Sequence, residues 1–198
     1  MPRLFTALEI PRDAALSLSL LRGGLPGARW ADAENYHLTL RFIGDVEGHV
    51  ADDIVNALDR VRRPAFSIHL SGVGAFGSKK PHAIWAGVAH SIELNALQAE
   101  IDRICTRHGA PADPRRFTPH VTLARLRNAA PGDVAAYLSA RGNFATAPFR
   151  VGRFVLMSAR DSVGGGPYVI EEAWPLGASG AGSAGLHAGA AEARWMMR

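Results

Sequence analysis

The sequence predicts a mixed fold of helices and strands that is built from two similar halves. The order strand, helix, strand occurs twice along the 198 residues. A short motif, His-x-Thr-Leu, occurs once in each half, at 37–40 and 120–123, so the two motif histidines lie 83 residues apart. The chain is 47% hydrophobic with a mean hydropathy of +0.01, which is enough to bury a core. We therefore expect one two-lobed domain.

The elements of the first half follow from periodicity and from glycine and proline breaks. Alternating apolar residues predict strands, and apolar residues three to four apart predict helices. The expected order is a strand at 3–10, a helix at 13–21, a loop through 26–27, a strand at 36–43, a helix at 47–61, a strand at 65–70, a glycine-rich loop at 72–81 and a strand at 83–88.

The second half repeats this order after the strand at 83–88. The same patterns predict a helix at 91–108, a strand at 120–126, a helix at 132–140, and strands near 149–157 and 168–174. A single offset of 83 residues indicates a duplicated half-domain rather than a solenoid, whose repeats are shorter and more numerous. A pseudo-twofold pair of lobes would bring the two motifs face to face.

Both motifs lie on predicted strands, where residues two apart share a face. His37 and Thr39 therefore point the same way, while Leu38, Leu40 and Phe42 form the opposite, apolar face. The second motif repeats this arrangement. If the two strands are neighbours, two imidazoles and two hydroxyls meet in one cleft. Such a site suits an anion that needs proton transfer at both ends, and a phosphodiester is such a group.

Composition limits the class of protein. The single Cys105 excludes an internal disulfide and lies in a helical pattern, which indicates a buried thiol and a reducing compartment. The start shows no signal peptide, and no apolar run approaches the ~18 to 20 residues of a membrane span. We expect a cytoplasmic protein that does not bind membranes. The net charge of +4 fits a phosphate-bearing partner or an ordinary solvated basic surface.

Two further expectations concern the tail and metals. From residue 177 to 198 the chain is rich in Gly, Ala and Ser, which predicts a disordered tail after a domain at 1–176. A zinc site at the motif histidines would need a third ligand, and no zinc motif supplies one. The six remaining histidines lack a Thr two residues later and are interpreted as surface or locally satisfied residues. We expect neither a metal nor a cofactor.

The chain resembles the 2H phosphoesterase superfamily, and within it the bacterial and archaeal RNA 2′,3′-cyclic phosphodiesterases, once called 2′-5′ RNA ligases. The resemblance spans about residues 3–176. It rests on RLFTAL at 3–8, HLTL followed by FIG at 37–44, FTPHVTLAR at 117–125, Tyr168, and WPL at 174–176. The tail has no counterpart in this pattern.

The resemblance implies an α+β bilobal fold with two antiparallel sheets lining a central cleft and helices on the outside. It also implies metal-independent hydrolysis of an RNA 2′,3′-cyclic phosphate end to a 2′-phosphomonoester, with weak reverse 2′-5′ ligation allowed. His37 would be the proton donor and His120 the proton acceptor, an assignment that the nearly symmetric sequence does not make by itself. Thr39 and Thr122 would donate hydrogen bonds to the phosphate, although Thr is also an ordinary strand residue. We expect the protein to act as a monomer.

Four more residues are candidates for substrate binding. Arg125 could meet the phosphate, but alternation turns it away from His120, so a surface or interlobe ion pair is the alternative. Phe42, Phe76 and Trp85 could stack a nucleobase, with core packing as the alternative. Other substrates stay open, namely a small cyclic nucleotide such as ADP-ribose 1″,2″-cyclic phosphate or a 2′-5′-linked oligonucleotide. A non-catalytic module that binds nucleotides or RNA ends is the alternative outside the enzymes.

Overall fold

The computed structural model describes residues 3–159 and 167–177, and the predicted tail lies outside this part. It shows an α+β fold, as predicted. None of the described helices is long and apolar enough to cross a membrane. In chain order the elements are β1 (Arg3–Glu9), α1 (Arg12–Ser19), β2 (Ala28–Trp30), the 3-10 turn η1 (Ala33–Asn35), β3 (His37–Gly44), α2 (Gly48–Leu58), β4 (Phe66–Ile68), β5 (Leu70–Phe76), β6 (Ala83–Val88), α3 (Ile92–Arg107), β7 (His120–Leu126), α4 (Pro131–Arg141), β8 (Phe149–Val151), β9 (Arg153–Ala159) and β10 (Tyr168–Pro175).

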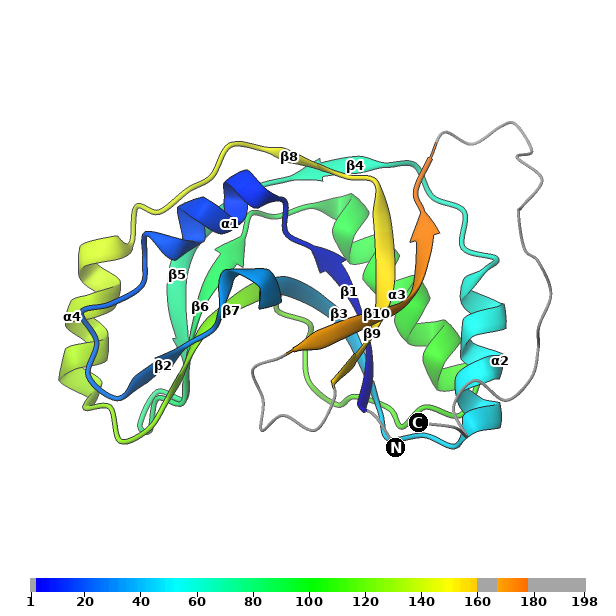
Figure 1. Ribbon diagram of the computed structural model, residues 1–198, viewed down its shortest axis with the longest axis horizontal. Coiled ribbons are helices and arrows are strands. Elements are labelled where there is room, and N and C mark those ends of the chain that lie inside the picture. Colours follow the sequence, from blue (N-terminus) through cyan, green and yellow to red (C-terminus); the bar gives the residue numbers. More distant parts are fainter. Residues whose placement is uncertain (1–2, 160–166, 178–198) are drawn as a thin grey trace.

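The strands of the two halves form one sheet instead of the two sheets that were expected (Figure 1). The strand order is β10-β9-β1-β3-β7-β6-β5, with β2 beside β7, and every pair is antiparallel. The halves join at β3 and β7, where Leu38 pairs with Val121. Pairing of these two strands removes the open edge that each half would otherwise expose. The second sheet is small and contains only β4 and β8.

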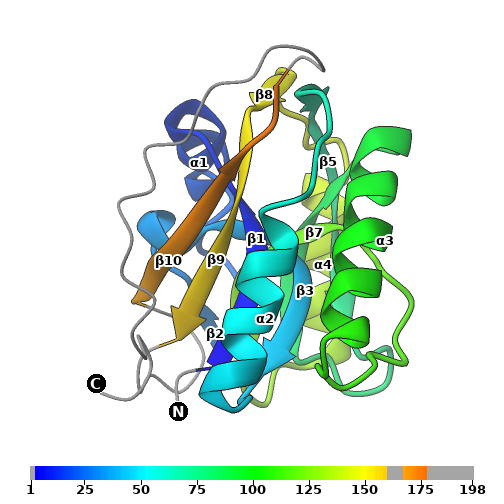
Figure 2. The same cartoon turned by 90° about the vertical axis from the view of Figure 1, so that its right-hand side faces the viewer.

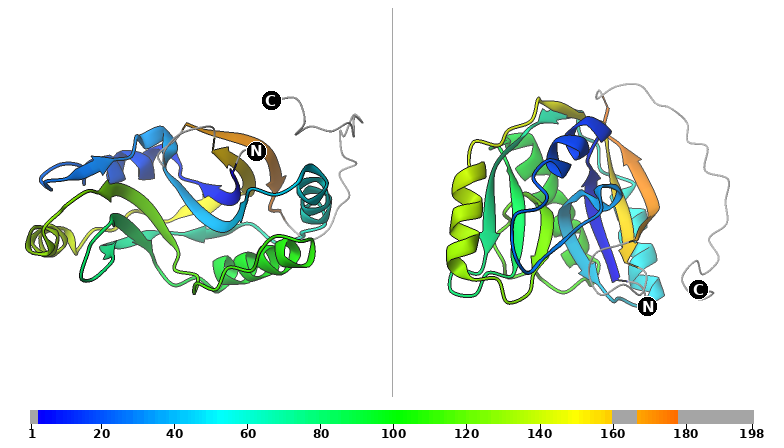
Figure 3. Two further views of the ribbon diagram at one scale, coloured as in Figure 1. Left: turned by 90° about the horizontal axis from the view of Figure 1, so that it is seen from below. Right: turned by 60° about the vertical axis from the view of Figure 1, so that its left-hand side comes forward.

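The helices differ in their relation to the sheet. Helix α3 packs on β3 and against α2, and Figure 2 shows these two helices side by side in front of β3. Helix α4 packs on β5 at the far edge of the sheet (Figure 3). Helix α1 instead contacts η1 and contributes Arg12, Ala15 and Leu16 to a pocket beside the first motif. Three helices therefore match the expected outer layer, and α1 borders the site.

Strand β1 is buried on both faces, which fixes the first half of the sheet around it. Leu4 and Leu8 belong to the main core, whereas Phe5 and Ala7 form a second apolar cluster with Val155 and Met157. This second cluster lies on the face of the sheet that carries the motif side chains, because Phe5 contacts the ring of His37. The first motif thus stands on a packed surface.

The segment at 72–81 was predicted to be a loop, and this was wrong for its first part. Residues 70–76 form β5, which pairs with β6. The glycines are needed for packing: a Cβ on Gly74 would lie 2.2 Å from the Trp85 ring, its cross-strand partner. Phe76 consequently ends a strand instead of lying in a flexible loop.

A buried arginine ties the sheet to α3. Arg41 is 4% exposed, and its Nε lies 2.5 Å from Oδ1 of Asp102. Its guanidinium also donates to the carbonyls of Phe42 and Pro111. A buried charge requires an ion pair and hydrogen bonds of this kind, because the cost of its desolvation is not otherwise compensated.

We expect Asp102→Ala to lower the free energy of unfolding by about 3 kcal/mol, since it leaves the Arg41 charge buried without its carboxylate. Urea denaturation measures this change. In an Arg41→Met background the same substitution should cost less than about 1 kcal/mol, because no charge is then left unpaired. An equal cost in both backgrounds would show that the ion pair is not the cause.

Candidate active site

The two motifs lie on neighbouring strands and face the same side of the sheet. Leu38 and Val121 form the antiparallel pair that joins β3 to β7, and both side chains are fully buried in the core. Because alternate residues point to opposite faces, the flanking motif side chains project from the other side of the sheet. The structure thus brings together His37, Thr39, His120 and Thr122, all of which are partly exposed.

Each imidazole is held in the same way. Nδ1 of His37 lies 2.8 Å from the carbonyl oxygen of Asn35, and Nδ1 of His120 lies 2.7 Å from that of Thr118. A carbonyl oxygen only accepts, so Nδ1 donates its proton in both cases. The Nε2 atom is therefore the nitrogen left for a substrate on each ring. The shared two-residue offset between histidine and carbonyl repeats the internal symmetry of the sequence.

Aromatic rings surround both histidines. The His37 ring lies 5.0 Å from Phe5 and 4.8 Å, edge to face, from Tyr168 on β10. The His120 ring lies 4.9 Å, edge to face, from Phe76 and 6.3 Å from Trp85. These contacts fix the ring planes and shield the imidazoles from water. Phe76, a predicted binding residue, therefore lies against the second catalytic candidate, while Tyr168 had no binding role in the sequence prediction.

The surroundings lower the pKa of both motif histidines. Burial lowers the pKa of His37 below 6.5, and the charges of His120 and Arg125 lower it further against the opposing Asn35 carbonyl. Burial also lowers the pKa of His120, with Arg125 adding to the effect and the Thr118 carbonyl opposing it. The neutral imidazole is favoured at both positions. A bound anion would raise both pKa values, because it stabilises the imidazolium.

A β-bulge in each motif strand changes the predicted side-chain directions. In the pairing of β1 with β3, Thr6 lies opposite Arg41 and the next residue, Ala7, lies opposite Thr39. Strand β3 therefore holds one extra residue between these two pairs. The pairing of β6 with β7 shifts in the same way between Ile84 and Trp85. The burial patterns of the two strands are consequently identical over seven residues, with two successive buried positions followed by an exposed one.

The bulges correct two expectations that rested on simple alternation. Phe42 is 48% exposed and lies 5.8 Å from Phe5, on the face of His37, while Arg41 takes the core position. Arg125 is exposed on the face of His120, not turned away from it. The charge of Arg125 lowers the pKa of His37 and of His120. Burial raises the pKa of the Tyr168 hydroxyl, and Arg125 partly opposes this increase.

The segment between α3 and β7 runs along the exposed Phe42 ring. Arg115 lies 5.8 Å above this ring and forms an ion pair with Asp113. Arg41 binds the carbonyl of Pro111 in the same segment. Because this segment leads to Thr118, whose carbonyl holds His120, the buried arginine helps to place the second motif relative to the first.

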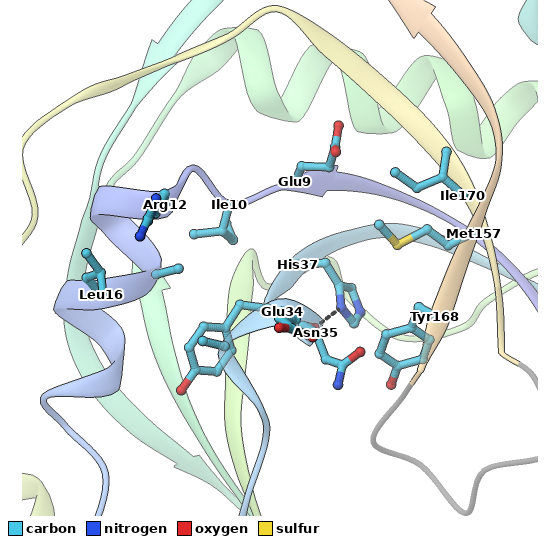
Figure 4. Close-up of a pocket in the computed structure, with 13 residues that line it drawn as sticks. Glu9, Ile10, Arg12, Leu16, Glu34, Asn35, His37, Met157, Tyr168 and Ile170 are labelled. Carbon is cyan, nitrogen blue, oxygen red and sulfur yellow. Dashed lines mark hydrogen bonds between the residues drawn. The ribbon is translucent and has the colours of Figure 1, made fainter.

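A pocket opens beside the first motif (Figure 4). It has a volume of about 460 Å³ and lies between α1, η1 and the strands β9 and β10. His37 and Tyr168 point into it, together with apolar side chains from each wall. These include Ile10, Leu16, Met157 and Ile170, while Glu9 and Glu34 supply carboxylates.

In residues 3–159 and 167–177, no group of three or more His, Cys, Asp or Glu side chains is arranged to hold a metal ion. Cys105 is buried and free in the core, and burial raises the pKa of its thiol to about 12. The two motif strands thus supply two imidazoles, two hydroxyls and one guanidinium to the site.

The sequence profile of a known family, described as the 2′-5′ RNA ligase superfamily, matches residues 12–162. This match spans most of the chain and includes both motif strands. The chain belongs to the 2′-5′ RNA ligase superfamily. The sequence resemblance to this family is thereby confirmed.

Several members of the 2′-5′ RNA ligase superfamily are similar to this chain. An RNA 2′,3′-cyclic phosphodiesterase of Aeropyrum pernix is 39% identical over 122 residues, which are 61% of this chain and 69% of that protein. One from Thermotoga maritima is 32% identical, over 63% of this chain and 70% of the relative. The crystal structure of Escherichia coli LigT complexed with 3′-AMP has a TM-score of 0.73 at 26% identity, covering 89% of this chain and 99% of LigT.

Proposed function

We propose that this protein hydrolyses the 2′,3′-cyclic phosphodiester end of RNA to a 2′-phosphomonoester without a metal ion. The observation that carries the proposal is the pair of imidazoles on one face of β3 and β7, each with Nδ1 bound to a carbonyl. The names of the relatives from Aeropyrum pernix and Thermotoga maritima, both RNA 2′,3′-cyclic phosphodiesterases, support the substrate class. Binding of a phosphate alone would not require two matched proton carriers.

In the proposed reaction, water attacks phosphorus and the bond from phosphorus to O3′ breaks. His120 takes a proton from the water through Nε2, and His37 gives a proton to the departing O3′, leaving a 2′-phosphate and a 3′-hydroxyl. The charge of the bound phosphate raises the pKa of the donor imidazole, so that one ring is protonated while the other is neutral. If a 5′-hydroxyl of a second strand attacks phosphorus in place of water, the same two proton transfers break the bond to O3′ and leave a 2′-5′ phosphodiester, which is weak ligation.

Arg125 and the motif threonines stabilise the phosphate in this proposal. The guanidinium of Arg125 lies on the same face as both imidazoles and offsets the negative charge that builds up on the phosphate oxygens. Thr39 and Thr122 donate their hydroxyl protons to the non-bridging oxygens. Phe42 and Phe76 provide exposed or half-buried rings beside the motifs for a nucleobase.

We expect Thr39→Val and Thr122→Val each to lower kcat by roughly 10- to 100-fold, because each removes one hydrogen bond to a charged group. Valine keeps the shape and the strand preference of threonine, so the fold should be retained. Steady-state kinetics on a cyclic nucleotide measure the effect. Unchanged kinetics in both variants would leave the threonines with a structural role alone.

The proposed activity is tested with 2′,3′-cyclic mononucleotides and short RNAs that end in a cyclic phosphate, in excess chelator. The expected result is conversion to the 2′-phosphomonoester at a rate that the chelator does not change. Formation of a 3′-phosphomonoester would contradict the assigned leaving oxygen. Binding without turnover would identify a nucleotide-binding module instead, and turnover restricted to ADP-ribose 1″,2″-cyclic phosphate or to 2′-5′-linked oligonucleotides would identify one of the other candidate substrates.

A further inference from the structure

Two arginines lie directly opposite each other at the end of the site face. Strand β2 pairs with β7 so that Arg29 faces Arg125, and both side chains are exposed. Residues opposite each other in an antiparallel pair share a face, with Cβ atoms about 4.5–5.5 Å apart. The neighbours of Arg29 on β2, Ala28 and Trp30, pack against the core. Both guanidinium groups therefore rise from the face that carries His120.

This arrangement is unfavourable unless an anion is present. Like charges directly opposite each other destabilise a strand pair. Within the described part of the chain, no ion pair joins either arginine to a carboxylate, whereas Arg63, Arg115 and Arg153 each have an acidic partner. Two unneutralised guanidinium groups side by side match the geometry of a phosphate, which each can bind through two hydrogen bonds.

Basic side chains gather at one end of the face that carries the motif histidines. Phe76, Ala83, Arg125 and Arg29 form one row across β5, β6, β7 and β2. The turn that follows β5 at the same end of the sheet carries the exposed Lys79 and Lys80. The pocket beside His37 is closer to neutral, because Arg12 lines it together with Glu34 and its Glu9 forms an ion pair with Arg153. A polyanionic strand is thus favoured over β7 and β2 in preference to the pocket.

We propose that Arg29 and Arg125 bind a second phosphate of the RNA, the phosphodiester on the 5′ side of the nucleotide that carries the cyclic phosphate. The inference rests on the proposed function. It adds that the enzyme prefers the cyclic phosphate at the end of an oligonucleotide to a cyclic mononucleotide, which has no second phosphate. The cyclic phosphate occupies both 2′ and 3′ oxygens of the terminal ribose, so any further phosphate of the strand lies on the 5′ side.

The position of the arginine pair along β7 fits a second phosphate. Arg125 follows Thr122 by three residues on the same face, with the bulge between them. At about 3.3 Å per residue, the pair lies roughly 7 to 10 Å beyond the catalytic threonine. Arg125 therefore lies between the two phosphates and can bind both, while Arg29 on the neighbouring β2 contacts only the second one.

The test compares three substrates with the same terminal base: a 2′,3′-cyclic mononucleotide, a dinucleotide ending in the cyclic phosphate, and the same dinucleotide with an uncharged methylphosphonate linkage. We expect kcat/KM for the dinucleotide to exceed that for the mononucleotide by roughly 10- to 100-fold. Arg29→Gln should lower this ratio about tenfold. The methylphosphonate should lose the advantage in the wild-type protein. Arg150→Gln, which removes one exposed charge from β8 on the small sheet, should leave the ratio unchanged.

A ratio that Arg29→Gln does not change, or a methylphosphonate that is as good as the phosphodiester, would overturn the second-phosphate site. If the wild-type protein turns over none of the cyclic substrates, the proposed function fails and the site is judged by binding. The dissociation constants of a non-cyclic dinucleotide with a phosphodiester or a methylphosphonate linkage are then compared. Tighter binding of the phosphodiester that Arg29→Gln removes would support the site, and equal binding would refute it.

Discussion

Replacing His37 or His120 with alanine is expected to lower kcat on a 2′,3′-cyclic phosphate by roughly 100- to 10,000-fold each, because each change removes one proton transfer in the transition state. In each ring Nδ1 already donates to a backbone carbonyl, so Nε2 is the nitrogen that would transfer the proton, and alanine offers no replacement for it. The double variant should lose little more than either single one, since the two transfers belong to one step.

The control for this prediction is His49→Ala. His49 lies on α2 with a highly exposed side chain, and its ion-pair partner is Glu47 at the start of that helix. Its replacement should leave kcat and the circular dichroism spectrum unchanged. Full activity of either motif variant would refute the paired mechanism, and loss of folding in a motif variant would be detected by the same spectrum.

Arg125→Gln is expected to lower kcat/KM by roughly 100- to 1,000-fold and to move the pH profile to higher pH. The first effect is the loss of a charged donor to the developing phosphate charge. The second follows from the pKa values, because Arg125 lowers the pKa of both His37 and His120. Removing this positive neighbour makes protonation of both rings easier, so both pKa values rise.

The wild-type profile of kcat/KM against pH should be bell-shaped, because one imidazole must be neutral and the other protonated. Its two apparent pKa values belong to the pair. Since burial lowers both, the maximum should lie below pH 6.5, and it should move upward in Arg125→Gln. Arg150→Gln should leave the profile in place. A maximum above pH 6.5 in the wild-type protein, or no shift in the variant, would contradict the role of Arg125.

The sequence predicted the motif strands well, because their alternation is local. It did not predict the bulge in each strand, because a bulge depends on pairing with β1 or β6 and not on the residues of the strand alone. Phe42 and Arg125 were for this reason placed on the wrong faces. The repeat itself contained a signal: Phe42 and Arg125 both lie five residues after their motif histidine.

Long-range pairing explains the other differences. The short β2, which contributes Arg29, has only three residues and lies between the loop predicted at 26–27 and the strand predicted from residue 36, where no element was predicted. Strand β5 was read as a loop because Gly74 usually indicates a turn, whereas here it makes room for Trp85. The joining of both halves into one sheet depends on the contact of Leu38 with Val121, which no local pattern indicates. The monomeric state and the cytoplasmic location stay predictions.

The most direct test of the central claim is a crystal structure of this protein with a non-hydrolysable mimic of the cyclic phosphate, such as a uridine–vanadate complex. The proposed mechanism predicts that Nε2 of His37 and Nε2 of His120 each lie about 2.6–3.2 Å from oxygens on the same vanadium atom, one on each side. A complex in which the vanadate contacts only one of the two rings, or binds outside the cleft, would contradict it.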